Sequence, residues 1–255
     1  MYKIIKHIMA DILRNKVILS YTLLLAIASF SIFALEDTSS KGILSMLNVL
    51  LMVVPLFSLI FSTIYIYNSS EFIELLLSQP IPRKTIWRSL YFGLSIAMSL
   101  AFFLGSGIWI LVFQADYLGF MLLLIGLLLT LGFSSIAFLT ALLAKDKAKG
   151  IGISIFSWLF FAIIYDGIIL FLLFQFSDYP IEKLMIFISF LNPIDLARIL
   201  LLMQLDVSAL MGYTGAIFKD FFGTQMGIII SYLCLIMWIL VPFKISENIF
   251  AKKDL

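Results

Sequence analysis

Residues 44–67, LSMLNVLLMVVPLFSLIFSTIYIY, contain no charged side chain, and residues 68–89, NSSEFIELLLSQPIPRKTIWRS, follow them directly with two glutamates and three cations. A membrane-spanning helix needs roughly 20 mostly apolar residues, a length that the first stretch reaches. A helix is the expected form because it satisfies its own backbone hydrogen bonds in lipid. The two stretches together predict a membrane span followed by a short polar connection.

The same pattern extends over the whole chain of 255 residues. Of these residues 63% are hydrophobic and 13% are charged, whereas soluble domains carry about 25% charged residues. One soluble core cannot bury so much apolar surface, so much of it must face lipid. We expect an all-α, polytopic integral membrane protein with one transmembrane domain over residues 1–255. Its six spans are expected at about 17–35, 44–67, 89–113, 120–144, 151–176 and 225–243.

The distribution of lysine and arginine predicts the orientation of these spans. Thirteen of the 17 cations fall in the N-terminal arm, in the connections after the second and fourth spans, and in the tail. Connections rich in lysine and arginine stay on the cytoplasmic side. Both termini are therefore expected in the cytoplasm, and the first apolar run is interpreted as a retained helix because no small-residue cleavage site follows it.

The arm at residues 1–16 has the pattern of an amphipathic helix. Such a helix, with basic residues opposite apolar ones, lies along a membrane surface. The single histidine, His7, has no neighbouring histidine or cysteine, so no metal site is expected there. The apolar face is Ile4, Ile5, Ile8, Ile12 and Leu13, and the basic residues are Lys3, Lys6, Arg14 and Lys16.

The connection at residues 177–224 is expected on the outer side. Within it, IDLARILLLMQL has apolar residues at helical spacing, and Asp195 and Arg198 lie three apart, where they can pair on one helix face. The alternative is a seventh span near 184–203, which would place Asp195 and Arg198 in lipid and move the C-terminus outside. Asp166, within the fifth span, is either part of a translocation path or a structural polar contact.

Residues 68–84 predict a short helix and a rigid corner. Glu71 and Glu74 fall in the first turn of this helix, where the helix dipole favours anions. Pro80 ends the helix and Pro82 can begin the next one. Trp87 suits the headgroup level of the membrane. The stretch is either a solvated loop with interfacial anchors or a helix that docks in a groove of another protein.

Two sequence elements carry a resemblance to a known family. The first is ELLLSQPIPR at residues 74–83, and the second is LNPIDLARIL at residues 191–200. With six expected spans, the chain resembles the permeases of ABC-type exporters of the type 2 permease family. Within that family it is most similar to the NosY-type permeases of the nitrous oxide reductase maturation system.

This resemblance implies a membrane subunit of an ATP-driven transporter in the inner membrane, working by alternating access. The helix near residues 71–79 would then couple to a separate ATPase, through Glu71, Glu74, Leu75, Leu76, Ser78, Gln79, Pro80 and Arg83. Candidates for the translocation path or outer gate are Asp166, Asn192, Asp195 and Arg198.

The resemblance also implies the partners. The chain has no G-x-x-x-x-G-K-[ST] phosphate loop, so no cofactor is expected in it, and ATP and Mg would be bound by the partner ATPase. A second copy of the chain and a periplasmic NosD-like accessory protein would complete the assembly, with no nucleic acid. NosY-like systems support assembly of the copper–sulfur centre of nitrous oxide reductase.

Two other classes of function compete with this one. A proton-coupled secondary transporter using Asp166 is the main alternative, and the missing inverted repeat weakens it. An intramembrane enzyme needs a histidine, cysteine or serine dyad at membrane depth. With His7 outside the spans and Cys234 alone, we expect the chain not to be an enzyme.

Overall fold

The six predicted spans are present as helices. In a computed structural model of the protein, every residue is described except 37, 145, 177–181, 206–217, 219, 220 and 253–255. The described residues form helices and their connections, without a strand. This confirms the all-α polytopic class. The helices and helix runs long enough and apolar enough to cross a membrane are Lys16–Leu35 (α2), Ser39–Asn68 (α3), Arg83–Phe113, Tyr117–Leu143 (α7), Lys147–Gln175 and Gln225–Lys252 (α13).

Two of these spans contain a π-helical turn. The third span consists of α5 (Arg83–Phe102), the π-turn η1 (Phe103–Gly107) and α6 (Ile108–Phe113). The fifth consists of α8 (Lys147–Leu159), the π-turn η2 (Phe160–Ile164) and α9 (Tyr165–Gln175). Such turns add a residue to a helix and often lie at functional sites.

Four shorter helices complete the described fold. These are α1 (Tyr2–Leu13), α4 (Ser70–Leu77), α10 (Glu182–Ser189) and α11 (Pro193–Leu202). The alternative of one span over residues 184–203 is wrong, because α10 and α11 are separate helices divided by a turn at residues 190–192. Asn192 starts the second helix, since its Oδ1 accepts a hydrogen bond from the backbone N–H of Ile194. Within the predicted outer connection, residues 177–181, 206–217, 219 and 220 lie outside the described residues.

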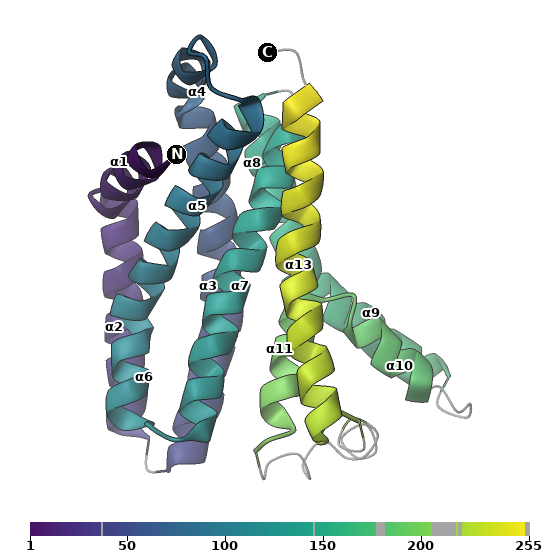
Figure 1. The fold of residues 1–255 in the computed structure, drawn as a ribbon. Helices are drawn as coiled ribbons and strands as arrows, with labels where there is room; N and C mark the ends of the chain where they lie inside the picture. The colour runs from purple at the N-terminus through teal and green to yellow at the C-terminus, as the bar shows by residue number, and fades with distance from the viewer. Residues whose placement is uncertain (37, 145, 177–181, 206–217, 219–220, 253–255) are drawn as a thin grey trace.

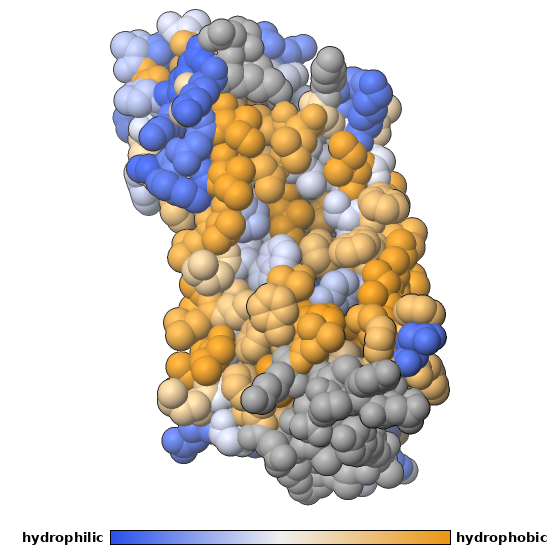
Figure 2. All heavy atoms as spheres, turned by 90° about the vertical axis from the view of Figure 1, so that its right-hand side faces the viewer, coloured by the Kyte–Doolittle hydropathy of each residue, from blue (hydrophilic) through white to orange (hydrophobic). Residues whose placement is uncertain are grey.

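The helices form a bundle with two distinct ends. Figure 1 shows α1, α4 and the last turn of α13 at one end, which we call the α4 end. The start of α8 lies there as well, because Lys147 Nζ donates a hydrogen bond to Asn68 Oδ1 at the end of α3. Figure 2 shows hydrophilic residues gathered at this end above a broad hydrophobic band. The described cations of α1 and of the last turn of α13, and those at the starts of α5 and α8, therefore lie at this end of the bundle.

The centre of the bundle is α7, which packs against α3, α5 and α13. In the most apolar window of this span 67% of the residues are buried, whereas only 6% are buried in the corresponding window of the fifth span. The first and third spans also meet closely at η1. A Cβ added at Gly105 would lie 2.9 Å from both Leu25 Cβ and Thr22 O.

The predicted amphipathic arm is a helix, but its apolar face meets protein. Ile8 and Ile12 of α1 are fully buried, and Ile8 lies against α5 so closely that a Cβ on Gly93 would be 2.7 Å from its Cγ2. Lys3 and Lys6 remain exposed. The arm therefore forms part of the folded bundle at the α4 end.

The last span runs further than the sequence predicted. Its apolar stretch was expected to end near residue 243, but α13 continues to Lys252. The extension has a physical cause, because Glu247 and Phe250 are buried against the start of α5. The sequence analysis used the tail only for its cations, and the inward face of this extension was not recognised.

Candidate functional site

The short helix α4 presents one face to the bundle and the other to solvent. Ile73 and Leu76, three residues apart, are buried and 6% and 4% exposed. Glu71, Glu74 and Leu75 are exposed, and Leu75 keeps 57% of its surface open. Because residues three apart share a helix face, the two buried side chains fix the rotation of the helix and leave a mixed acidic and apolar surface facing outward.

The predicted corner follows this helix. Ser78 Oγ donates a hydrogen bond to the carbonyl of Leu75 at 2.8 Å, and so closes the last turn. Ser78, Gln79 and Pro80 are exposed. The next helix, α5, begins at Arg83 directly after Pro82. We call the outward residues Glu71, Glu74, Leu75, Ser78, Gln79 and Pro80 the α4 surface. Of the predicted coupling residues, only Leu76 lies in the core and Arg83 is half-buried.

A cavity of about 250 Å³ borders α4, and its lining includes Ile73, Glu74, Trp87 and Phe250. The arm helix adjoins α4 too, since the rings of His7 and Phe72 are 5.8 Å apart. The α4 surface therefore stands on a junction of α1, α3, α5 and α13.

This junction contains an ionic and aromatic cluster that the sequence did not predict. Trp87, which the sequence placed at the headgroup level, faces the interior of the protein: it is 1% exposed and its ring stacks on Phe250 at 4.4 Å. Its Nε1 donates a hydrogen bond to Ser246 Oγ. The buried carboxylate of Glu247 pairs with Arg88, and with Lys244 at 2.9 Å. The spacing of Lys244 and Glu247, three residues apart, was the one sequence signal that could have predicted part of this cluster.

The predicted gate residues form a second cluster, on α9 and α11, which Figure 1 places away from the α4 end. Arg198 Nη1 lies 2.6 Å from Asp166 Oδ2 and 3.6 Å from Asp195 Oδ1. The predicted pairing of Asp195 with Arg198 is confirmed. The closer partner, Asp166, is 32 residues away along the chain and sequence spacing could not reveal it.

Asn192 joins this cluster to the fifth span. Its Nδ2 donates a hydrogen bond at 2.8 Å to the carbonyl of Phe161, within the π-turn η2. Tyr165 adds a second link, because its hydroxyl donates to the carbonyl of Ile188. Arg198 therefore joins α11 to α9 through Asp166, Asn192 joins the start of α11 to η2, and Asp195 pairs with Arg198 on the same helix.

The electrostatics of this cluster are unbalanced. Two carboxylates share one guanidinium, and the Oδ1 atom of Asp166 is buried without a hydrogen-bond partner in the described part of the chain. Asp195, on α11 outside the six spans, is 6% exposed. Burial raises its pKa to about 6, Arg198 opposes that rise, and Asp166 adds to it. A cavity of about 220 Å³ borders the cluster and reaches Phe218.

Comparison with known proteins agrees with this architecture. The family described as ABC-2 family transporter protein matches residues 2–255. A protein of Stutzerimonas stutzeri named "Probable ABC transporter permease protein NosY" is 25% identical over 285 aligned residues, which cover 99% of this chain and 98% of that protein. The protein of the same name from Pseudomonas aeruginosa is 24% identical, over 97% of this chain and 96% of its own length.

The family match favours an ATP-driven transporter over a proton-coupled one that uses Asp166. The six spans and the match along nearly the whole chain agree on one assignment. The chain belongs to the ABC-2 transporter family, as a multi-pass membrane permease subunit of an ABC transporter.

Proposed function

We propose that a separate ATPase docks on the α4 surface and drives alternating access in this permease. The observation that carries the proposal is the division of α4 into two faces. Glu74 and Leu75 are exposed, while Ile73 and Leu76 are locked into the core. A helix fixed in this way transmits a push to the bundle, because packed interiors are stiff.

The connections of α4 decide which helices move with it. It is joined to α3 through Ser69 and to α5 through the corner at residues 78–82. Trp87 and Arg88, in the first turns of α5, are bound to Ser246 and Glu247 of α13. A displacement of α4 therefore moves α3, α5 and α13 together, as rigid helices moving against the rest of the molecule.

In this proposal the α4 end faces the cytoplasm of a cell with an inner membrane. The cations gathered at that end support the orientation by the positive-inside rule, and both termini would then be cytoplasmic. ATP and Mg would bind to the partner ATPase. The cluster of Asp166, Asn192, Asp195 and Arg198 would lie toward the outer side, as part of the path or its gate.

The fifth span supports pairing with a second copy of the chain. Only 6% of the residues in its apolar window are buried within one copy, so most of them keep surface that a partner helix or lipid can cover. The gate cluster begins on this same span at Asp166. In a dimer formed there, the two clusters would face a shared central path.

The experiment that tests the coupling is co-purification of the ATPase in mild detergent. We expect Glu74→Lys and Leu75→Asp to reduce the ATPase bound, and its ATP hydrolysis, at least about tenfold, since an interface hot spot contributes more than 1.4 kcal/mol. Lys252→Glu is the matched control, an exposed charge reversal at the same end. The proposal fails if the α4 variants bind ATPase as the control does, or if the lone chain transports without any ATPase.

The relation to NosY supports a narrower role in assembling the copper–sulfur centre of nitrous oxide reductase, with a NosD-like accessory protein on the outer face. Removing this chain from its host is then expected to leave nitrous oxide reductase without the absorption of that centre. Restoring the wild-type chain returns the absorption, and Leu75→Asp does not. A normal spectrum in the absence of the chain contradicts this role.

A further inference from the structure

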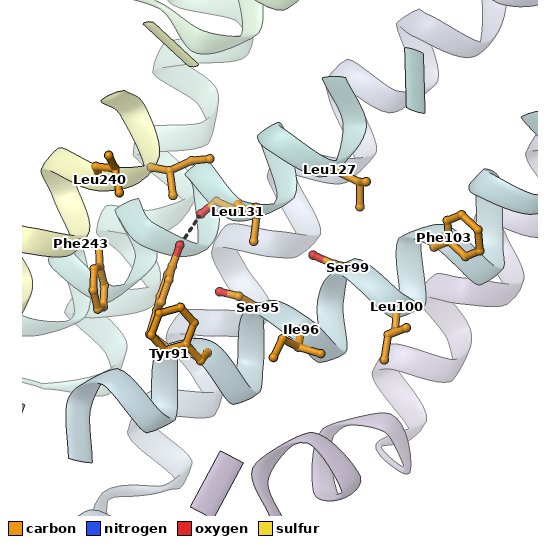
Figure 3. A pocket seen from close by; sticks show the side chains of 12 residues that line it. Tyr91, Ser95, Ile96, Ser99, Leu100, Phe103, Leu127, Leu131, Leu240 and Phe243 are labelled. Carbon is orange, nitrogen blue, oxygen red and sulfur yellow. Dashed lines mark hydrogen bonds between the residues drawn. The ribbon is translucent and has the colours of Figure 1, made fainter. Parts of the chain in front are cut away.

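A groove of about 490 Å³ lies between α5 with η1, α7 and α13, and one of its ends adjoins the junction beneath the α4 surface. Figure 3 shows the side chains that line it, contributed by these elements. Phe92 and Ile96 of α5 and Leu240 of α13 are 41%, 42% and 54% exposed. All of these elements belong to membrane spans, so the groove opens toward the hydrocarbon region of the bilayer.

The surface that lines this groove is apolar. Ser95 is 2% exposed and its Oγ atom is buried. The hydroxyl of Tyr91 is bound to Ser135 Oγ at 2.8 Å, and Figure 3 shows its second contact, to the carbonyl of Leu131. A polar solute would find little to bind here, whereas a hydrocarbon chain would bury apolar surface at about 25 cal/mol per Å².

The length of the groove matches one leaflet of a bilayer. It extends along the third span from Tyr91 to Phe103, which at 1.5 Å per residue is about 18 Å. Half of the hydrocarbon core of a bilayer is about 15 Å. An acyl chain of one leaflet therefore fits the groove from end to end.

Two cations lie beside the end of the groove that Tyr91 and Phe243 form. Arg88 is one helical turn before Tyr91, toward the α4 end, and Lys244 directly follows Phe243. Their side chains are 43% and 61% exposed, while their shared partner Glu247 is 1% exposed. Together, the two cations and the one carboxylate carry a net positive charge, which favours the binding of a phosphate group.

We propose that this groove binds one anionic phospholipid of the surrounding bilayer. An acyl chain lies along α5 and η1 against α7 and α13, and the phosphate contacts Arg88 and Lys244. The bound lipid bridges α5 and α13 at the corner that follows α4. This binding site does not depend on which ATPase drives the transporter.

Native mass spectrometry of the purified chain tests the site, with the phosphatidylglycerol POPG and the phosphatidylcholine POPC as probes. We expect the wild type to retain one POPG in preference to POPC. Ile96→Trp, which fills the groove, abolishes that retention. Lys244→Gln weakens it about fivefold, the factor expected for the loss of one cation at an anionic membrane surface. The matched control is Leu23→Trp, at a 62% exposed position on α2, and it retains POPG as the wild type does.

Three outcomes overturn the proposal. Equal retention of POPC and POPG shows that the cations do not select the headgroup. Retention of POPG by Ile96→Trp places the lipid elsewhere. A chain dimer that Ile96→Trp dissociates shows that a second copy covers the groove. Lys244→Gln replaces an exposed side chain with one that can still donate a hydrogen bond to Glu247, and circular dichroism checks its helix content, so its result stands even if Ile96→Trp fails to fold.

Discussion

Glu247 lies buried on α13 between two cations that solvent still reaches. Its side chain is 1% exposed, against 43% for Arg88 and 61% for Lys244. A buried carboxylate depends on its partners because it has lost its own hydration, whereas an exposed cation that loses its partner is solvated again. The two sides of this ion pair therefore differ in what their removal costs.

We expect Arg88→Ala to destabilise the folded chain by about 3 kcal/mol, since it leaves a buried charge half-neutralised. Glu247→Ala is expected to cost about 1 kcal/mol, because the cations that it leaves are hydrated. Thermal unfolding in detergent, followed by circular dichroism, gives both values. A larger loss for Glu247→Ala than for Arg88→Ala contradicts this assignment of burial.

At the scale of elements, the long apolar segments could be predicted and the contacts between them could not. The length and apolar composition of the six spans were sufficient, because a span is defined by its own residues. Trp87, Glu247 and the pair of Asp166 with Arg198 depend on helices that are distant in sequence. Spacing rules reach only neighbours on one helix, so they found Asp195 with Arg198 and missed the other contacts.

The close approach of α2 to η1 gives a prediction at this scale. A Cβ at Gly105 meets the backbone oxygen of Thr22 at 2.9 Å, and backbone cannot move aside cheaply. We expect Gly105→Ala to destabilise the protein by roughly 1–3 kcal/mol. Gly167→Ala, on α9, is the matched control because nothing lies within 4 Å of its added Cβ. It is expected to be neutral or stabilising by up to about 1 kcal/mol. Equal losses of thermal stability in both variants contradict this packing.

At the scale of the whole molecule, the two candidate sites lie apart and are joined by the bundle. The α4 surface stands on the junction of α3, α5 and α13, and the gate cluster holds α9 to α11. The resemblance to ABC-type permeases implied the residues of both candidate sites, and the sequence marks most of them as polar interruptions of apolar sequence. The sequence could not show that Leu76 faces the core while Leu75 faces solvent. That difference depends on the rotation of α4 about its axis, which the sequence of neighbouring leucines does not specify.

The central claim is that movement of α4 by an ATPase reaches the gate. Pulsed electron paramagnetic resonance measures it directly on a Cys234→Ser chain, spin-labelled at Leu170→Cys and purified with its ATPase. Leu170 is 54% exposed and lines the cavity beside Asp166, so the label reports the distance between the gates of two copies. Our account predicts that Mg-ATP shifts this distance, and that adding Leu75→Asp abolishes the shift. A distance unchanged by Mg-ATP, or a shift that persists with Leu75→Asp, would contradict it.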